Sequence, residues 1–393
     1  MKPIRVLQLF FGFTIEGPLG GGAERFGIEL SRALDKTQVQ SLACSLWNFN
    51  TPFEKEWRNM LQLEGIPTFT GAAWEESSPY RAFYKAVKGL KNQLAGQSID
   101  IIHSHTQFTD VAAILVKHTL NAKVLIRTVH NEREWPKQQL WRRLILTDWV
   151  YPLIFDIETG VSKQVVTNLN NRSGARLLKK EARCIYNAIN LQRFENLQID
   201  CLSKKRDLNL PEDAIIIGSI GRLAQQKGYT FLIQAAQKVI DYLPQARFII
   251  IGGGDLHNEL ITQIHSLGLD GKVILTGPQK NIESLIAIMD VFALSSLWEG
   301  LPTTILESFA MGVPVVATDV SGSRELIKSE YNGLLVPPAN ATSLAKAIIK
   351  ISTEKEFAFQ LAQNAKNTLN HFTISQVASQ YTEIYLNTMG TNF

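Results

Sequence analysis

Short runs of apolar, often β-branched residues alternate along the whole chain with longer segments whose apolar residues recur at helical spacing. This alternation is typical of repeated βαβ units, in which parallel strands are buried between helices. The first half of the chain predicts strands at Ile4–Phe10, Val39–Leu46, Ile99–His103, Val124–Val129 and Ile154–Val161. The second half predicts strands at Ala214–Ile220, Arg247–Ile251, Val273–Leu275, Val291–Leu294 and Val313–Ala317. The expected fold class is α/β, with parallel sheets and helices on both faces.

The length of 393 residues exceeds the usual size of one hydrophobic core and predicts two domains. A polar stretch around residues 187–210 lacks strong periodicity and is the candidate hinge. We therefore expect one α/β domain at 1–190, a hinge at 191–210 and a second α/β domain at 211–370. Residues 371–393 are expected to form a closing helix that can pack back on the N-terminal domain, with Val377, Tyr381, Ile384 and Tyr385 on its apolar face.

Composition places the chain among ordinary globular proteins, since 45% of its residues are hydrophobic and 19% are charged. No apolar run approaches the length that spans a bilayer. The apolar stretch that follows Lys2 and Arg5 is short and has no small-residue cleavage site, so we expect a cytoplasmic protein rather than a secreted one. Three cysteines without a CxxC spacing indicate neither a disulfide framework nor a zinc site.

Charge is distributed unevenly within the net +4 of the chain. Residues 1–190 hold 24 Lys and Arg against 17 Asp and Glu, which leaves 16 against 19 for the rest. Ten of these basic residues fall in two clusters, Arg127, Arg133, Lys137, Arg142 and Arg143, and then Arg172, Arg176, Lys179, Lys180 and Arg183. Such clusters are usually solvated faces, and contact with a membrane surface or an anionic acceptor is the alternative.

One segment within the first basic cluster has the composition of an interfacial helix. Lys137 to Tyr151 predicts a helix with Arg142 and Arg143 on one face, and its other face holds Leu140, Trp141, Leu144 and Ile145. Apolar anchors beside basic residues favour weak peripheral binding to an anionic membrane. The alternative is that the apolar face packs into the core of the N-terminal domain.

The strongest chemical signal is the segment Ser296–Glu307, in which Glu299 and Glu307 are separated by seven residues. A strand precedes it, and Pro302 suits the first turn of a following helix. Glu299 would then lie in the loop and Glu307 about two turns into the helix. A carboxylate so placed can accept hydrogen bonds from a ribose diol, and the loop offers free N–H groups to a phosphate or a sugar.

Two loops that follow predicted strands carry weaker signals. Gly221–Gly228 places Arg222 and Lys227 where α/β sheets bind ligands, and two cations there could neutralise a diphosphate. Gly21 and Gly22 lead into a helix and would let the backbone approach an anion closely. Taken singly, a solvated loop explains the first feature better than a binding site does, and a tight turn without function explains the second equally well.

Together these segments resemble family 4 of the retaining glycosyltransferases, whose GT-B fold has two facing Rossmann-like domains. The resemblance covers almost the whole chain and includes both glutamates, the Arg222/Lys227 pair, the Gly-Gly-Ala-Glu loop and Ile102-His103-Ser104-His105. Ile251–Asp255 and Thr318–Glu325 are lesser matches. The chain departs from the family at Tyr186–Asn190, where Pro-Asn-Gly-(Val/Ile)-Asp is usual, so the role of that loop is left open.

The resemblance implies a nucleotide-sugar donor domain at 211–370 and an acceptor-side domain at 1–190. It implies that Arg222 and Lys227 hold the β-phosphate, that Glu307 binds the ribose, and that Glu299 faces the transferred sugar. Backbone amides around Gly300 and Leu301 would assist, and Gly253 would also line the donor site. Gly21 and Gly22 would close over the phosphate. His105 would point at the reacting sugar, a role for which His103 and His130 compete.

The function implied is transfer of a sugar, with retention of configuration, from a UDP- or GDP-sugar to a glycan or lipid-linked acceptor. Cell-surface polysaccharide or glycolipid synthesis is the expected context, on the inner face of the membrane and without nucleic acid. No Asp-x-Asp occurs, so we expect no metal and no other cofactor.

Three other functions compete with this one. An NAD-dependent oxidoreductase would need a G-x-G-x-x-G after a strand, which the chain lacks. A nucleotide-sugar epimerase of the same fold and a non-catalytic nucleotide-sugar binder remain open.

Overall fold

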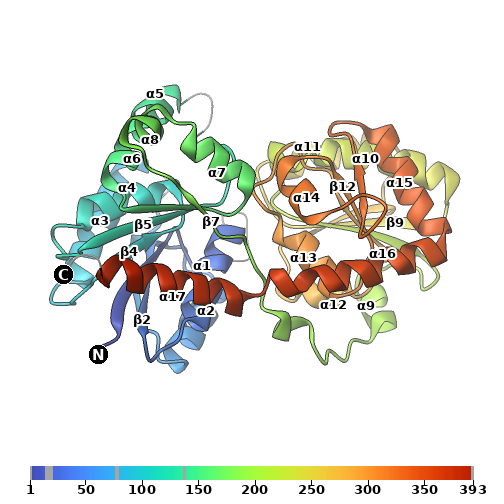
Figure 1. Ribbon diagram of the computed structural model, residues 1–393. Helices are drawn as coiled ribbons and strands as arrows, with labels where there is room; N and C mark the ends of the chain where they lie inside the picture. Colours follow the sequence, from blue (N-terminus) through green and yellow to red (C-terminus); the bar gives the residue numbers. More distant parts are fainter. Residues whose placement is uncertain (1, 14–20, 76–78, 136–138, 391–393) are drawn as a thin grey trace. The chain divides into compact units, whose positions relative to one another are not determined.

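Two compact units of α/β structure make up the chain in the computed structural model, which describes residues 2–13, 21–75, 79–135 and 139–390 (Figure 1). The first unit comprises the described residues up to Ala188 together with those from Ile374 onward. The second unit comprises Ile189–Thr373.

The first unit contains a seven-stranded parallel sheet with the order β3-β2-β1-β4-β5-β6-β7. Its strands are β1 (Ile4–Phe10), β2 (Val39–Asn48), β3 (Thr68–Ala73), β4 (Ile101–Ser104), β5 (Val124–Val129), β6 (Ile157–Gly160) and β7 (Arg183–Cys184). Its helices include α1 (Gly22–Ala33), α2 (Pro52–Leu63), α3 (Pro79–Gln93), α4 (Gln107–Val116), α7 (Lys163–Asn170), α8 (Ser173–Leu178) and α17 (Ile374–Gly390).

Successive residues of the strands feed two different cores, one on each face of the sheet. In β1, Val6 packs with α1 and α17, whereas Leu7 packs with α3 and α4. In β4, Ile101 likewise packs in the core that contains α1 and α17, and Ile102 packs in the core that contains α3 and α4. Neighbouring side chains of a strand point to opposite faces, so a strand buried on both sides must be apolar throughout. This explains the continuous apolar runs of the sequence.

A buried polar network attaches the C-terminal helix α17 to this sheet. The Tyr385 hydroxyl lies 2.7 Å from His103 Nδ1 and accepts from the Gln8 amide at 3.1 Å. One turn earlier, the Tyr381 hydroxyl lies 2.7 Å from Thr128 Oγ1 and 2.9 Å from Thr159 Oγ1. Each hydroxyl therefore has partners in a dry interior, where an unpaired polar group would cost free energy.

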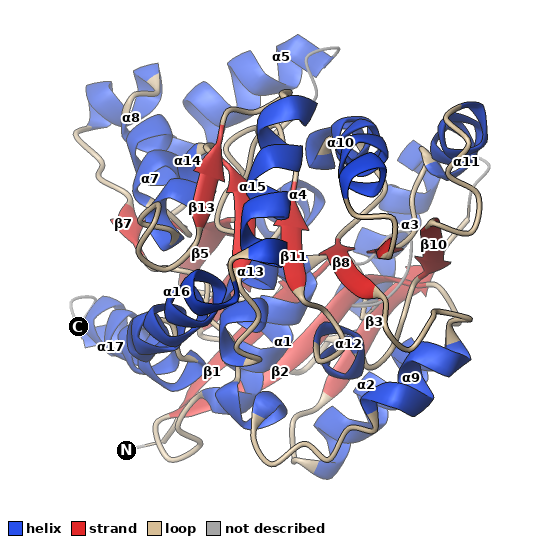
Figure 2. Ribbon diagram, turned by 90° about the vertical axis from the view of Figure 1, so that its right-hand side faces the viewer, coloured by secondary structure: helices blue, strands red, loops and turns tan. Residues whose placement is uncertain are grey.

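The second unit contains a six-stranded parallel sheet with the order β10-β9-β8-β11-β12-β13, flanked by helices (Figure 2). Its strands are β8 (Ile215–Ile220), β9 (Ala246–Ile251), β10 (Val273–Gly277), β11 (Val291–Leu294), β12 (Val315–Thr318) and β13 (Leu334–Val336). Its helices are α9 (Cys201–Asp207), α10 (Tyr229–Tyr242), α11 (His257–Ser266), α12 (Ile282–Ile286), α13 (Thr303–Ala310), α14 (Ser321–Leu326), α15 (Ala341–Thr353) and α16 (Lys355–Thr368).

In each sheet the chain order reverses beside the first strand of the unit. β1 lies between β2 and β4, and β8 lies between β9 and β11. Loops at the carboxyl ends of two such strands diverge to opposite sides, and α/β proteins bind ligands in the resulting crevice. The topology thus predicts one candidate crevice in each unit.

The expected α/β class with parallel sheets is confirmed in both units. The predicted strand Ile154–Val161 is wrong at its start, because a helical turn ends at Ile154 and β6 begins only at Ile157. The strands β3, β7 and β13 were not predicted. They lie at or next to a sheet edge, and β7 and β13 are only two and three residues long, too short for a recognisable pattern.

Candidate functional site

An ion pair between Lys227 and Glu299 joins two loops of the second unit, those that follow β8 and β11. Lys227 Nζ lies 2.6 Å from Glu299 Oε1, and the Ser296 hydroxyl donates to the same oxygen at 2.6 Å. The two charged side chains are largely shielded, with 16% and 6% of their surface exposed. The structure therefore brings together two residues that the sequence presented in separate motifs.

Backbone contacts hold these two loops at a fixed spacing. The Leu297 N–H donates to the Gln226 carbonyl at 2.7 Å, and the Ser295 hydroxyl donates to the Lys227 carbonyl at 2.8 Å. Gly228 has a φ of 61°, and a Cβ there would lie 2.3 Å from the Ser295 carbonyl oxygen. A side chain at this position would push the loops apart, so glycine is required.

Arg222 lies in the same loop as Lys227 but is exposed, and it forms no ion pair with any residue that the structure describes. The backbone next to it is held by the loop after β9, since the Leu223 N–H donates to the Gly253 carbonyl at 2.8 Å. Gly254 approaches so closely that a Cβ would lie 2.5 Å from the Leu223 oxygen. Gly253 therefore supports the Arg222 loop through its backbone.

Gly300 and Leu301 are buried and come directly before the N-terminus of α13. Gly322, at the start of α14, packs against them so tightly that a Cβ would lie 2.6 Å from the Gly300 oxygen. The N-cap residue of α13 is Pro302, and no side chain caps the helix. Uncapped N–H groups at a helix N-terminus favour a negatively charged ligand.

Glu307 lies in the second turn of α13 with only 1% of its surface exposed. Arg193 Nη1 lies 3.6 Å from Glu307 Oε1. The same guanidinium donates from Nε at 2.9 Å and from Nη2 at 2.5 Å to Glu283 of α12. Arg193 thus bridges two carboxylates of the second unit. Sequence reasoning missed it because it lies in the expected hinge, outside any recognisable motif.

In the first unit, the three histidines that competed for one role form a single buried cluster. The ring centroids of His103 and His105 are 4.3 Å apart, and those of His105 and His130 are 5.9 Å apart. His105 follows β4 and His130 follows β5, two neighbouring strands, so both lie at the carboxyl edge of the sheet. Burial lowers the pKa of His103 and of His130 to about 3 and that of His105 well below its usual range.

Hydrogen bonds define the tautomer of His105. Its Nε2 lies 2.8 Å from Gln8 Oε1, an oxygen that can only accept, so Nε2 carries the hydrogen. Its Nδ1 is buried without a partner among the described residues. Neutral His105 therefore offers one lone pair at Nδ1 and cannot act as a proton donor from that atom.

Gly21 and Gly22 lie at the start of α1, at the same edge of the first sheet. Gly21 is the N-cap with an extended backbone, and a Cβ there would lie 3.2 Å from the Glu24 carboxylate. Farther along α1, Phe26 contacts the His105 and His130 rings at centroid distances of 6.0 and 5.1 Å. The glycine turn and the histidine cluster therefore belong to one region of the first unit.

The predicted site residues thus form two groups, one at the carboxyl edge of each sheet. The first unit holds Gly21, Gly22 and His105. The second unit holds Arg222, Lys227, Gly253, Glu299, Gly300, Leu301 and Glu307.

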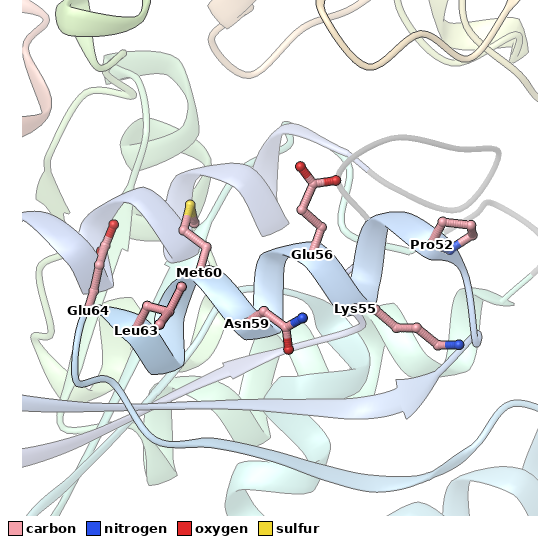
Figure 3. A pocket seen from close by; sticks show the side chains of 7 residues that line it. All are labelled: Pro52, Lys55, Glu56, Asn59, Met60, Leu63 and Glu64. Carbon is pink, nitrogen blue, oxygen red and sulfur yellow. The ribbon is translucent and has the colours of Figure 1, made fainter.

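A separate hollow of about 630 Å³ runs along α2, lined by Lys55, Glu56, Met60 and neighbouring residues (Figure 3). It contains none of the predicted site residues. Among the described residues, no three His, Cys, Asp or Glu side chains gather as a metal site would require. No helix formed by the described residues has the length and hydropathy needed to cross a bilayer.

Comparison with known proteins assigns both halves to glycosyltransferases. The model of "Glycosyl transferases group 1" matches residues 202–368, and that of "Glycosyltransferase Family 4" matches residues 20–193. An uncharacterized glycosyltransferase of Methanocaldococcus jannaschii is 30% identical over 73% of this chain and 75% of its own. A second one from that archaeon is 31% identical over 59% of each chain. A Campylobacter jejuni N-acetylgalactosaminyltransferase, named for an undecaprenol-linked acceptor, is 26% identical over 95% of this chain and 97% of its own.

The fold agrees with these matches. Anabaena HepE, solved with UDP and glucose, superposes with a TM-score of 0.79 at 20% identity, covering 97% of this chain and 99% of its own. The two parallel α/β units and the matches to both family models define a glycosyltransferase of the GT-B class. The chain belongs to family 4 of these enzymes.

We expect the stability of the first unit to fall as the pH is lowered from about 7 to about 5. Unfolded histidine binds a proton near pH 6.5, whereas buried His103 and His130 resist protonation until about pH 3. Each such residue therefore lowers the free energy of unfolding by about 1.4 kcal/mol per pH unit below 6.5. Burial raises the pKa of Asp110 to about 7, so below that pH the folded state binds a proton that the unfolded state does not bind. This stabilises the folded state and cancels the destabilisation caused by about one of the histidines.

Urea unfolding followed by tryptophan fluorescence measures this effect, because six of the seven tryptophans lie in the first unit. His103→Gln should make the pH dependence shallower, and the exposed His118→Gln should leave it unchanged. An unfolding midpoint that is equal at both pH values would contradict the expectation.

Proposed function

We propose that this chain transfers a sugar, with retention of configuration, from a UDP- or GDP-sugar to a glycan or lipid-linked acceptor. The observation that carries the proposal is the shielded Lys227–Glu299 pair at the crevice of the second sheet, beside exposed Arg222. The undecaprenol-linked acceptor named for the Campylobacter jejuni relative supports the acceptor class and a role in cell-surface polysaccharide or glycolipid synthesis. Such an acceptor would place the enzyme at the inner face of a membrane.

In this proposal the donor's diphosphate competes with Glu299 for Lys227. In the structure Glu299 Oε1 lies 2.6 Å from Lys227 Nζ and neutralises the lysine. A diphosphate bound between Arg222, Lys227 and the N-terminus of α13 would take over that role, and Glu299 would turn to the sugar hydroxyls. The two cations would then stabilise the charge that develops as the sugar–phosphate bond breaks, which in other transferases is the task of a metal.

Two other functions would use the same donor site. A nucleotide-sugar epimerase needs no acceptor, and a non-catalytic binder releases no nucleotide. Incubation with a donor and an acceptor separates the three, because only transfer yields free nucleoside diphosphate together with a glycosylated acceptor.

Replacing Lys227 should act mainly on turnover. Removing one cationic hydrogen-bond donor from a desolvated site raises the activation free energy by about 3–4 kcal/mol. Lys227→Ala should therefore lower kcat by about 10²–10³ and also raise the KM for the sugar donor. Exposed Lys238→Ala of α10, in the same unit, should retain wild-type kinetics. Assays in EDTA should show undiminished wild-type activity. Near-normal turnover in a folded Lys227→Ala, or activity that requires added Mg²⁺, would remove the two-cation mechanism.

Glu307 is proposed to bind the ribose, with Arg193 holding its carboxylate in place. Glu307→Gln should weaken both the donor and the free nucleoside diphosphate, because both contain the ribose. Arg193→Gln should weaken nucleoside diphosphate binding by about tenfold with little further change in kcat. Arg193→Lys should recover only part of the lost affinity, because the guanidinium contacts both Glu283 and Glu307 and a lysine cannot. Calorimetric titration measures these affinities. An unchanged affinity in Glu307→Gln would place the ribose elsewhere.

His105 is proposed to accept a hydrogen bond from the reacting sugar through Nδ1. His105→Asn should lower kcat/KM by about 5–30-fold, the equivalent of one lost hydrogen bond of about 1–2 kcal/mol. His130→Asn should have a smaller effect, because the buried His130 ring already interacts with the side chain of Asn187. If His130→Asn is the variant that loses turnover while remaining folded, the role passes to His130.

A further inference from the structure

The helical segment between β5 and β6 of the first unit exposes six large apolar side chains. It consists of α5 (Leu140–Arg142), a π-helix at Arg143–Val150 and α6 (Tyr151–Ile154). The exposed fractions are 55% for Leu140, 56% for Trp141, 51% for Leu144, 53% for Ile145, 50% for Trp149 and 66% for Leu153. The alternative that this face is buried in the core of the unit is therefore wrong.

The π-helical winding gathers these side chains onto one side. Leu140 and Trp149 are nine residues apart, which is about two and a half turns of an α-helix and would point them in opposite directions. A π-helix has more residues in each turn, so the same nine residues make only about two turns. The exposed apolar residues follow this wider spacing, from Leu140 to Leu144 and Ile145, then Trp149 and Leu153.

The neighbouring helix α8 extends the apolar surface. Leu177 and Leu178 are 72% and 41% exposed, and with Trp149, Val150 and Leu153 they line a hollow of about 200 Å³. We refer to these leucines and the six exposed residues of the preceding segment as the apolar patch. Figure 1 shows α5, α6 and α8 together at one end of the first unit.

The two helical parts of the apolar patch are firmly joined. Arg172, the N-cap of α8, donates from Nη1 to the Thr147 carbonyl at 3.1 Å and pairs with Glu158 of β6. Gly174 packs so closely that a Cβ would lie 2.3 Å from the Asp148 carbonyl oxygen. The apolar patch is therefore a preformed surface rather than two independent helices.

Basic side chains from both clusters noted in the sequence surround the apolar patch. Arg143, Arg176 and Lys179 are exposed, whereas in these two helical segments the acidic residue is the half-buried Asp148. Arg142, expected on the opposite face from Trp141, instead lies with its guanidinium 5.2 Å from the centre of the Trp141 ring. Apolar side chains next to cations are typical of a surface that binds a membrane, where the apolar groups contact the acyl chains and the cations contact anionic headgroups.

We propose that the apolar patch inserts into the surface of an anionic lipid bilayer. The charge around the patch selects this partner, because a protein interface is depleted of charge at its core, whereas headgroup phosphates attract arginine and lysine. The segment also starts near the carboxyl edge of the first sheet. The Arg142 guanidinium lies 5.1 Å from the Trp135 ring, which contacts Phe108 in the first turn of α4 at 5.8 Å, and α4 begins two residues after His105. Insertion there would bring that edge to the membrane, where a lipid-linked acceptor resides. This placement rests on the proposed function, but the binding itself does not.

Flotation with vesicles tests the proposal without any donor or acceptor. The protein should float with equimolar phosphatidylglycerol and phosphatidylcholine at low salt, and much less with phosphatidylcholine alone or at high salt. Leu153→Asp should weaken binding at least tenfold, because a charge replaces an inserted side chain. Arg143→Gln should weaken it about fivefold, the effect of one basic residue at the surface.

Leu63→Asp is the matched control, since Leu63 is an 89% exposed leucine on a helix of the same unit outside the apolar patch. It should bind like the wild type. The proposal is overturned if the protein stays out of the anionic vesicles at low salt, or if Leu63→Asp loses as much binding as Leu153→Asp. A concentration-dependent dimer abolished by Leu153→Asp, without flotation, would assign the apolar patch to a second copy of the chain. Transfer to a water-soluble acceptor analogue is assayed separately, so failure of membrane binding and failure of the transferase function are distinguishable.

Discussion

The pairing of β8 with β11 is the constraint on which the charged site of the second unit depends. These strands are separated in sequence by β9 and β10, yet they are neighbours in the sheet. Their carboxyl-end loops therefore meet, and residues 72 positions apart form the ion pair between Lys227 and Glu299. Gly228 makes the close approach of these two loops possible, and Gly254 and Gly322 allow the loop after β9 and the start of α14 to approach them, because a Cβ at any of the three would collide with a backbone oxygen.

In the first unit, polar side chains are buried in the interior and hydrogen-bonded to one another. His103 and the hydroxyls of Tyr381 and Tyr385 are fully buried, and hydrogen bonds between strands and α17 satisfy them. The same burial keeps the His105 ring neutral, with its tautomer fixed by Gln8. Among the described residues its Nδ1 has no partner, so this atom is suited to accept a hydrogen bond from a sugar hydroxyl but not to donate a proton.

Both units use the same architectural rule for different chemistry. Parallel strands direct their carboxyl ends to one edge, where glycine turns and helix N-termini expose backbone N–H groups. In the second unit this edge carries fixed charge, and in the first it carries neutral imidazoles and the beginning of the apolar patch. In the proposed function, the charged edge would bind the diphosphate of the donor, and the neutral edge would contact a sugar hydroxyl.

The sequence by itself determined the α/β class, the parallel sheets and most of the strands, because strands buried on both faces produce continuous apolar runs. It also marked Arg222, Lys227, Glu299 and Glu307 through local spacing around glycines and a helix start. Other features depended on residues far apart in the chain. The contact of Arg193 with Glu307, the clustering of three histidines and the exposure of Trp149 and Leu153 were decided only by tertiary structure. Local periodicity records which side of an element is apolar, but long-range packing decides whether that side is covered.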